Sequence, residues 1–141
     1  MKALDKHVML HHRARSYAFY QAMRLLSDDV NAYGNAVALL AVHAAISLAD
    51  AILIGCTGKR GNEQDHRAAI GALSRLCGER RINRDGIGHY RWLIEKKTPF
   101  SYGDRRLDPD KDNNNAMVKA ERFTVWAYKY FDVIAKAGPE Q

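Results

Sequence analysis

The segment from Arg84 to His89 carries the side chains best suited to chemistry on a phosphate group. An arginine and a histidine five positions apart at the start of a helix lie a little over one turn apart, so their side chains can converge on one ligand. A histidine with a near-neutral pKa can accept the proton of a ribose 2′-hydroxyl, and an arginine can brace the phosphate through two N–H bonds. We therefore assign His89 as general base or acid, Arg84 as the group that stabilises the pentavalent phosphate, and Asp85 as the group that orients one of them. The alternative is that Arg84 is a surface residue and His89 lies at the edge of the core.

A second set of candidate phosphate-binding residues precedes this segment. Lys59 and Arg60 lie in a glycine-containing loop, and His66 follows the helix-capping residue Asp65. His66 either completes a phosphate site with the two cations or anchors the loop through a hydrogen bond.

A third set follows it, in a segment over residues 100–110 that reads as an ordered loop. Tyr102 and Arg105 of this loop either touch the ligand or hold the loop to the bundle. In the second case they pair with His43 and Asp50, which lie seven positions apart on one helix face and need polar partners if buried.

Neither a metal site nor a cofactor site is predicted. His7 and His11 have a spacing that can bind a metal, but a third ligand is not evident. The stretch around Gly58-Lys59 lacks the spacing and the following Ser or Thr of a phosphate-binding loop. The two cysteines lack paired spacing and are expected to be reduced thiols.

The positive charge is concentrated in the middle of the chain. Twelve of the 22 Lys and Arg residues, but only six of the 16 Asp and Glu residues, lie between Lys59 and Arg106. The rest of the chain is balanced, so the whole excess of +6 belongs to this section. Such an excess indicates either a surface that meets phosphate or a solvated face that only aids solubility.

The length of 141 residues and a hydrophobic content of 47% predict one folded domain over residues 1–141. The longest apolar stretch, Ala36–Gly55, is interrupted by polar residues that include Asp50, which argues against a membrane span. The amino-terminal residues lack the apolar run of a secretory signal. We expect a cytoplasmic protein.

Hydrophobic periodicity predicts an all-α antiparallel bundle of about five helices. The first helix is expected over Leu4–Ser27, with Leu4, Val8, His11, Ala18, Ala22 and Leu25 on one face. The second, Ala32–Gly55, is apolar on nearly all sides and should be the central one, after a break at Asp28 and Asp29 that can cap it.

The remaining helices follow from caps and breakers. Asp65 should cap a third helix that Gly78 ends. A fourth is expected over Arg84–Lys97, with Ile87, Tyr90 and Ile94 facing inward and Pro99 as its terminator. The last should cover Lys111–Lys136.

The segment Arg84-Asp85-Gly86-Ile87-Gly88-His89 resembles the nuclease signature of the HEPN superfamily, small helical-bundle proteins of bacteria, archaea and their mobile elements. That signature is an Arg, a polar residue, a short spacer and a His. The stretches AVHAAISLADAIL, GKRGNEQDHRAAIGAL and KKTPFSYGDRRL are similar to the long helix, the loop and helix with its histidine, and the tyrosine-containing loop of one HEPN branch. The resemblance covers roughly residues 14–135.

This resemblance implies a homodimer in which Arg84 and His89 of both subunits line one cleft. It also implies pairing with a nucleotidyltransferase-like antitoxin, or a role in defence against phage. The function expected first is a metal-independent endoribonuclease of the toxin or phage-defence type, which cleaves RNA through attack of the 2′-hydroxyl. The alternative is a non-catalytic HEPN module that binds a nucleotide or a protein, or a dimerising scaffold, because members of the branch with the D-H-R-A helix often lack the nuclease motif.

Overall fold

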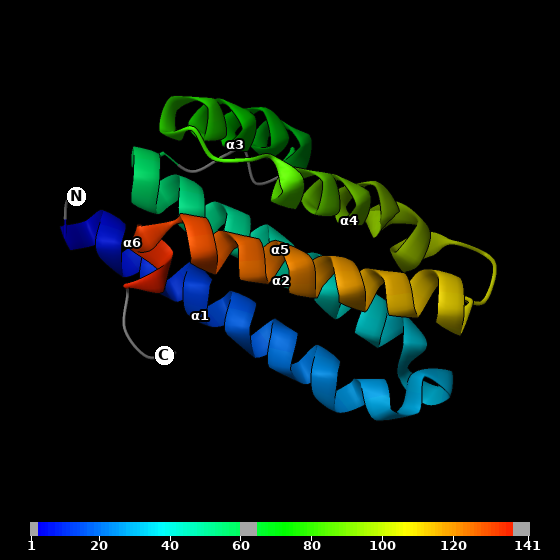
Figure 1. The fold of residues 1–141 in the computed structure, drawn as a ribbon. Helices are drawn as coiled ribbons and strands as arrows, with labels where there is room; N and C mark the ends of the chain where they lie inside the picture. Colours follow the sequence, from blue (N-terminus) through cyan, green and yellow to red (C-terminus); the bar gives the residue numbers. More distant parts are fainter. Residues whose placement is uncertain (1–2, 60–64, 137–141) are drawn as a thin grey trace.

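The chain folds into an antiparallel bundle of helices, which confirms the all-α prediction (Figure 1). The computed structural model describes residues 3–59 and 65–136, and no strand occurs within these ranges. The longer helices are α1 (Ala3–Leu26), α2 (Val30–Thr57), α3 (His66–Arg80), α4 (Asp85–Tyr102) and α5 (Asn114–Tyr130). Between and after them lie a 3-10 turn η1 (Ser27–Asp29), a π-helical turn η2 (Pro109–Asn113) and a short helix α6 (Asp132–Ala135).

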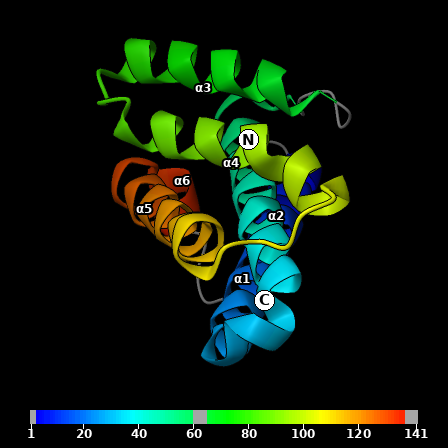
Figure 2. The same cartoon turned by 90° about the vertical axis from the view of Figure 1, so that its right-hand side faces the viewer.

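Helix α2 is the centre of the bundle, as its sequence predicts. Both views show α1 antiparallel to α2 on one side, α5 alongside, and α4 and α3 on the opposite side (Figure 2). Fourteen residues of α2 are buried, and six of them are alanines that let neighbouring helices approach closely: Ala38, Ala41, Ala44, Ala45, Ala49 and Ala51.

The predicted caps of the central helices are confirmed. The Asp29 carboxylate accepts a hydrogen bond from the Ala32 N–H at 3.2 Å, and the Asp65 carboxylate accepts one from the Arg67 N–H at 3.2 Å. Gly58 ends α2 in the left-handed region, with φ of 71°. Gly55, in contrast, lies inside α2 against Met9 and Val133.

The predicted inner face of α1 is wrong in part, because Val8 packs against the core whereas other residues of that face do not. Leu25 is 74% exposed, and Ala18 also faces solvent. The face against α2 instead carries Met9 and Met23 together with polar residues, among them Ser16, whose hydroxyl donates to the Ala44 carbonyl at 2.7 Å. Buried polar side chains, one of which bonds to the backbone of α2, therefore replace part of the apolar stripe that the periodicity implied.

Two predicted helix ends also differ from the structure. Helix α3 passes Gly78 and ends at Arg80, followed by Arg81 with φ of 57°. Helix α4 passes Pro99 and continues to Tyr102, so the predicted loop over residues 100–110 is helical at its start. The last turn of α4 holds because Phe100 is fully buried and the Pro99 carbonyl accepts from the Gly103 N–H at 2.9 Å. Burial of one large ring thus outweighs the break that proline favours.

The last helix is interrupted rather than continuous. η2 precedes α5, and Phe131 adopts an extended conformation, with φ of −117° and ψ of 94°, between α5 and α6. The Phe131 ring is fully buried, with its centroid 5.3 Å from that of Trp126. The break turns this ring into the core, where its burial stabilises the fold.

One helical stretch, Asp5–Thr57, has the length and apolar composition to cross a membrane. The most apolar window of this stretch is 78% buried inside the bundle. A core helix of a soluble protein has the same properties, and the structure is compatible with such a protein.

We expect Gly86→Ala to lower the free energy of unfolding by about 1–3 kcal/mol. A Cβ at Gly86 would lie 2.1 Å from the Cδ2 and Cε3 atoms of the Trp126 ring, so α4 and α5 would have to separate. Gly88→Ala is the matched control in the same helix, because nothing lies within 4 Å of its Cβ position. This control should gain about 0.5–1 kcal/mol from helix propensity. Urea denaturation followed by circular dichroism measures both, and equal losses would contradict this packing.

Candidate functional site

His89 lines a groove between α4 and α5. The groove has a volume of about 390 Å³ and is lined by Asn83, Asp85, Gly86, His89, Glu121, Arg122, Val125, Trp126, Lys129 and Tyr130. Its wall is the Trp126 indole, which contacts Gly86 and donates a hydrogen bond to the Asn83 carbonyl at 3.2 Å. The close approach of α4 and α5 at Gly86 therefore sets the width of the groove.

The environment of His89 keeps its imidazole neutral at pH 7. The side chain is half-buried, and this burial lowers the pKa of His89 from its ordinary value. The positive charges of Lys119 and Arg122 lower the pKa further, and the Asp85 carboxylate opposes them. A neutral imidazole beside cations can donate a hydrogen bond to a phosphate or accept a proton from a hydroxyl.

Arg84 does not share this groove. Its Nε donates to the Ser74 hydroxyl and its Nη2 donates to the Ser74 carbonyl, both at 3.0 Å. Gly78 makes room for the guanidinium, since a Cβ there would lie 3.0 Å from Nη2. Within one chain, Arg84 therefore ties the start of α4 to α3, and the convergence with His89 expected from the sequence is not found.

Asp85 lies where the sequence places it, at the start of α4 beside His89. It lines the groove, is exposed, and opposes the effect of the neighbouring cations on the pKa of His89. Of the three predicted catalytic residues, the structure thus brings Asp85 and His89 together and directs Arg84 to α3.

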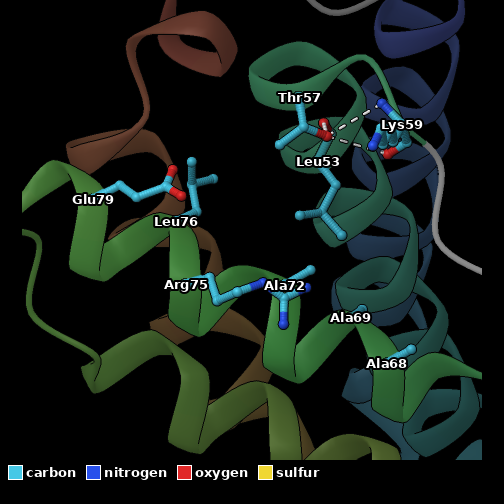
Figure 3. Close-up of a pocket in the computed structure, with 9 residues that line it drawn as sticks. All are labelled: Leu53, Thr57, Lys59, Ala68, Ala69, Ala72, Arg75, Leu76 and Glu79. Atoms are coloured by element: carbon cyan, nitrogen blue, oxygen red, sulfur yellow. Dashed lines mark hydrogen bonds between the residues drawn. The ribbon is translucent and has the colours of Figure 1, made fainter.

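Lys59 lines a different hollow, of about 440 Å³, between the end of α2 and α3. Figure 3 shows small apolar side chains of α3 opposite Leu53, with Arg75 and Glu79 on α3 and Lys59 across from them. The Lys59 N–H donates to the Thr57 hydroxyl at 3.2 Å. Arg60, predicted to act with Lys59, lies outside the described residues.

His66 is the first residue of α3 and lines a third hollow, between α1, α2 and α3. Its carbonyl accepts from the Tyr90 hydroxyl at 3.4 Å. The pKa of His66 is lowered, most of all by burial and next by the positive charge of Lys97 and by His43. The Asp65 carboxylate acts in the opposite direction. His43 and Asp50 line the same hollow, so the structure groups His66 with them rather than with Lys59.

Tyr102 and Arg105 are separated from all three hollows. Tyr102 is 83% exposed, and Arg105 pairs with Asp112 in η2 through Nη1–Oδ2 and Nη2–Oδ1 distances of 3.0 and 3.3 Å. The expectation that they pair with His43 and Asp50 is therefore wrong for Arg105. Its guanidinium instead holds the loop to η2, next to the start of α5.

Asp112 is buried and has a lowered pKa. Burial by itself would raise this pKa. It is outweighed by the hydrogen bonds that Asp112 accepts from Arg105 and from the Asp108 N–H at 2.7 Å, and by the positive charges of Arg105 and Lys96. The ionised carboxylate is thus one of the groups that hold the segment between α4 and α5.

The cations near His89 are not among the residues predicted from the sequence. Arg122 and Lys129 line the groove, and Lys119 lowers the pKa of His89; all three belong to α5, outside the basic section from Lys59 to Arg106. The spacing of Lys119 and Arg122 by three positions puts both on one helix face, which is the signal that would have found them.

Among the residues that the structure describes, no group of three or more His, Cys, Asp or Glu side chains is arranged to hold a metal ion. No protein-family model matches the chain, and no curated protein shows significant similarity to it. The candidate site therefore rests on its own geometry.

Stability should fall in acid partly through Asp112. Because its folded pKa is lowered, its contribution is present above the unfolded pKa of about 3.9 and is lost as the pH falls through the folded value. We expect the free energy of unfolding to decline less between pH 5 and pH 3 in Asp112→Asn than in the wild type. Asp132→Asn, which removes an exposed ion pair with Lys136 at 3.5 Å, is the control and should keep the wild-type decline. Identical pH profiles for the wild type and Asp112→Asn would contradict this role.

Proposed function

We propose that the protein binds RNA through the groove between α4 and α5. The observation that carries the proposal is a neutral, half-buried His89 that lines the groove with the cations Arg122 and Lys129. Arginine and lysine neutralise backbone phosphates, and a neutral imidazole can add a hydrogen bond to one of them. The overall charge of +6 favours the same class of partner.

A second candidate function adds cleavage to this binding, as in a metal-independent HEPN endoribonuclease. The lowered pKa of His89 favours it, because a neutral imidazole can take the proton of a 2′-hydroxyl that attacks the adjacent phosphorus. The products are a 2′,3′-cyclic phosphate and a released 5′-hydroxyl, which takes up a proton. Arg122 is the guanidinium that lines the groove with His89 and would stabilise the developing charge.

Two observations favour binding without cleavage. Arg84 is engaged by Ser74 and is directed away from the groove. In a proton-transferring histidine, one ring nitrogen is usually held by an orienting group. The Nδ1 atom of His89 is buried and has no hydrogen-bond partner within the described part of the chain.

The HEPN resemblance adds a homodimer to the proposal, with the two grooves side by side, and a nucleotidyltransferase-like antitoxin as a further partner. Val125, which lines the groove and is 61% exposed, offers an apolar contact that a second subunit would cover. Sedimentation analysis at micromolar concentration tests the dimer, and a mass near one chain would rule it out.

For binding, we expect Arg122→Gln to weaken the affinity for single-stranded RNA several-fold. It should also reduce the slope of log K against log salt concentration by about 0.7, the value for one lost phosphate contact. Arg91→Gln removes the same charge from an exposed position on α4 that does not line the groove, and it should leave the slope unchanged. Fluorescence anisotropy at several salt concentrations measures both, and equal effects of the two variants would refute binding in the groove.

If the groove also cleaves RNA, end-labelled RNA is cut in EDTA by the wild type and remains intact with His89→Ala. The rate should fall on the acid side of a pKa below 6.5, because His89 must be neutral to accept the proton. Arg84→Ala should lower stability through the loss of the Ser74 contacts and yet retain cleavage. Intact RNA with wild-type protein that still binds it would leave the binding function and exclude the nuclease.

A further inference from the structure

A histidine-rich cleft between α1, α2 and α3 has no part in the function proposed above. Its volume of about 800 Å³ is twice that of the α4–α5 groove. Its polar lining residues are His7, His11, His12, Arg15, His43, Ser47, Asp50 and His66. Clefts of about 300–1,000 Å³ with a few convergent polar groups are typical small-ligand sites.

Cationic groups lie at the rim of the cleft and near its imidazoles. At the rim, the Nη2 atom of Arg15 donates a hydrogen bond to Nε2 of His11 at 2.8 Å. This bond holds the guanidinium on the exposed face of α1. The ammonium of Lys97 on α4, which does not line the cleft, is close enough to His43 and His66 to lower the pKa of both. One cation therefore lines the cleft, and a second lies near its two half-buried imidazoles.

Among the lining residues described, Asp50 supplies the only carboxylate. Burial, and after it the negative charge of Asp50, raises the pKa of Tyr90, a residue of α4 whose hydroxyl donates to the His66 carbonyl. Asp50 is therefore close to Tyr90, and the cleft carries this one carboxylate besides its imidazoles and the Arg15 guanidinium.

An anion fits these groups better than a metal ion. A metal ion needs three or more donors brought together, and among the described residues no such group occurs. The Arg15 guanidinium and the imidazoles of His43 and His66 offer only N–H donors once the imidazoles are protonated, which matches the acceptor oxygens of a phosphate.

We propose that this cleft binds the phosphate group of a phosphate monoester through Arg15, His43 and His66. The monoester is either a free mononucleotide or the 5′-phosphorylated end of an RNA. The site is separate from the α4–α5 groove and does not depend on the function assigned to it.

Binding at this cleft takes up protons. In the free protein, burial and Lys97 lower the pKa values of His43 and His66, so both imidazoles are neutral at pH 7. A bound dianion favours their charged forms and raises both values, so affinity strengthens as the pH falls. The charged and titratable groups around them come from every packed element: His7, His11, His12 and Arg15 of α1, Asp50 of α2, Asp65 at the α3 cap, and Tyr90 and Lys97 of α4.

The first test is isothermal titration of the full chain with sulfate and with adenosine 5′-monophosphate in a phosphate-free buffer. Sulfate stays fully ionised, so its pH dependence reports on the protein alone. We expect sulfate affinity to rise between pH 8 and pH 6, by up to about tenfold per pH unit for each proton taken up. Affinity that does not change with pH would overturn the role of the two imidazoles.

Variants then locate the site. Arg15→Gln changes an exposed residue, so the fold should survive, and it should weaken monophosphate binding about tenfold through the loss of a charge-assisted contact. His43→Gln should weaken binding and reduce the pH dependence. Arg91→Gln, also exposed and outside the cleft, is the charge control and should bind as the wild type does.

To distinguish the two sources of the monoester, binding is compared for two RNAs of the same sequence, one with and one without a 5′-phosphate. Tighter binding of the phosphorylated RNA, lost in Arg15→Gln but kept in Arg122→Gln, would support an RNA end as the ligand. Mononucleotide binding without this difference would support a free nucleotide. If none of these probes binds more weakly to Arg15→Gln than to Arg91→Gln, or if only Zn²⁺ binds at the cleft, the proposal is wrong.

Discussion

The burial of α2 is the constraint on which the rest of the structure depends. This helix is apolar on nearly all sides, so it is stable only if other helices cover all of them. Its alanines bring α1, α4 and α5 close to its axis. The positions of these three helices then determine where hollows remain between neighbouring helices at the surface.

Polar side chains at the edges of this core acquire their properties from partial burial. His89, His43 and His66 lie on different helices, but burial is the largest cause of the lowered pKa in each. Cations near each imidazole act in the same direction. A helical bundle with a basic surface thus holds neutral imidazoles at pH 7 in two separate places, beside groups that attract phosphate.

Polar contacts help to hold the segment between α4 and α5. Asp112 accepts hydrogen bonds from Arg105 and from the Asp108 N–H, and the Asn113 amide donates to the Gly34 carbonyl of α2. These bonds satisfy buried polar groups that a short loop would otherwise leave unpaired. They also explain why Arg105, which looks like a ligand-binding residue in the sequence, has an internal partner.

The sequence by itself determined the features that depend on neighbours along the chain. The caps at Asp29 and Asp65, the central position of α2, and the inward face of Ile87, Tyr90 and Ile94 follow from local hydrogen bonding and from periodicity. The position of His89 beside Asp85 also belongs here, because both lie on one helix.

Only the tertiary structure decided the features that depend on contacts between distant segments. Burial of Phe100 carried α4 past Pro99, and burial of Phe131 broke the last helix. Ser74 engaged Arg84, and α5 supplied Arg122 to the groove instead. Periodicity and spacing describe one helix at a time, whereas the partner of a long side chain depends on which helix packs beside it.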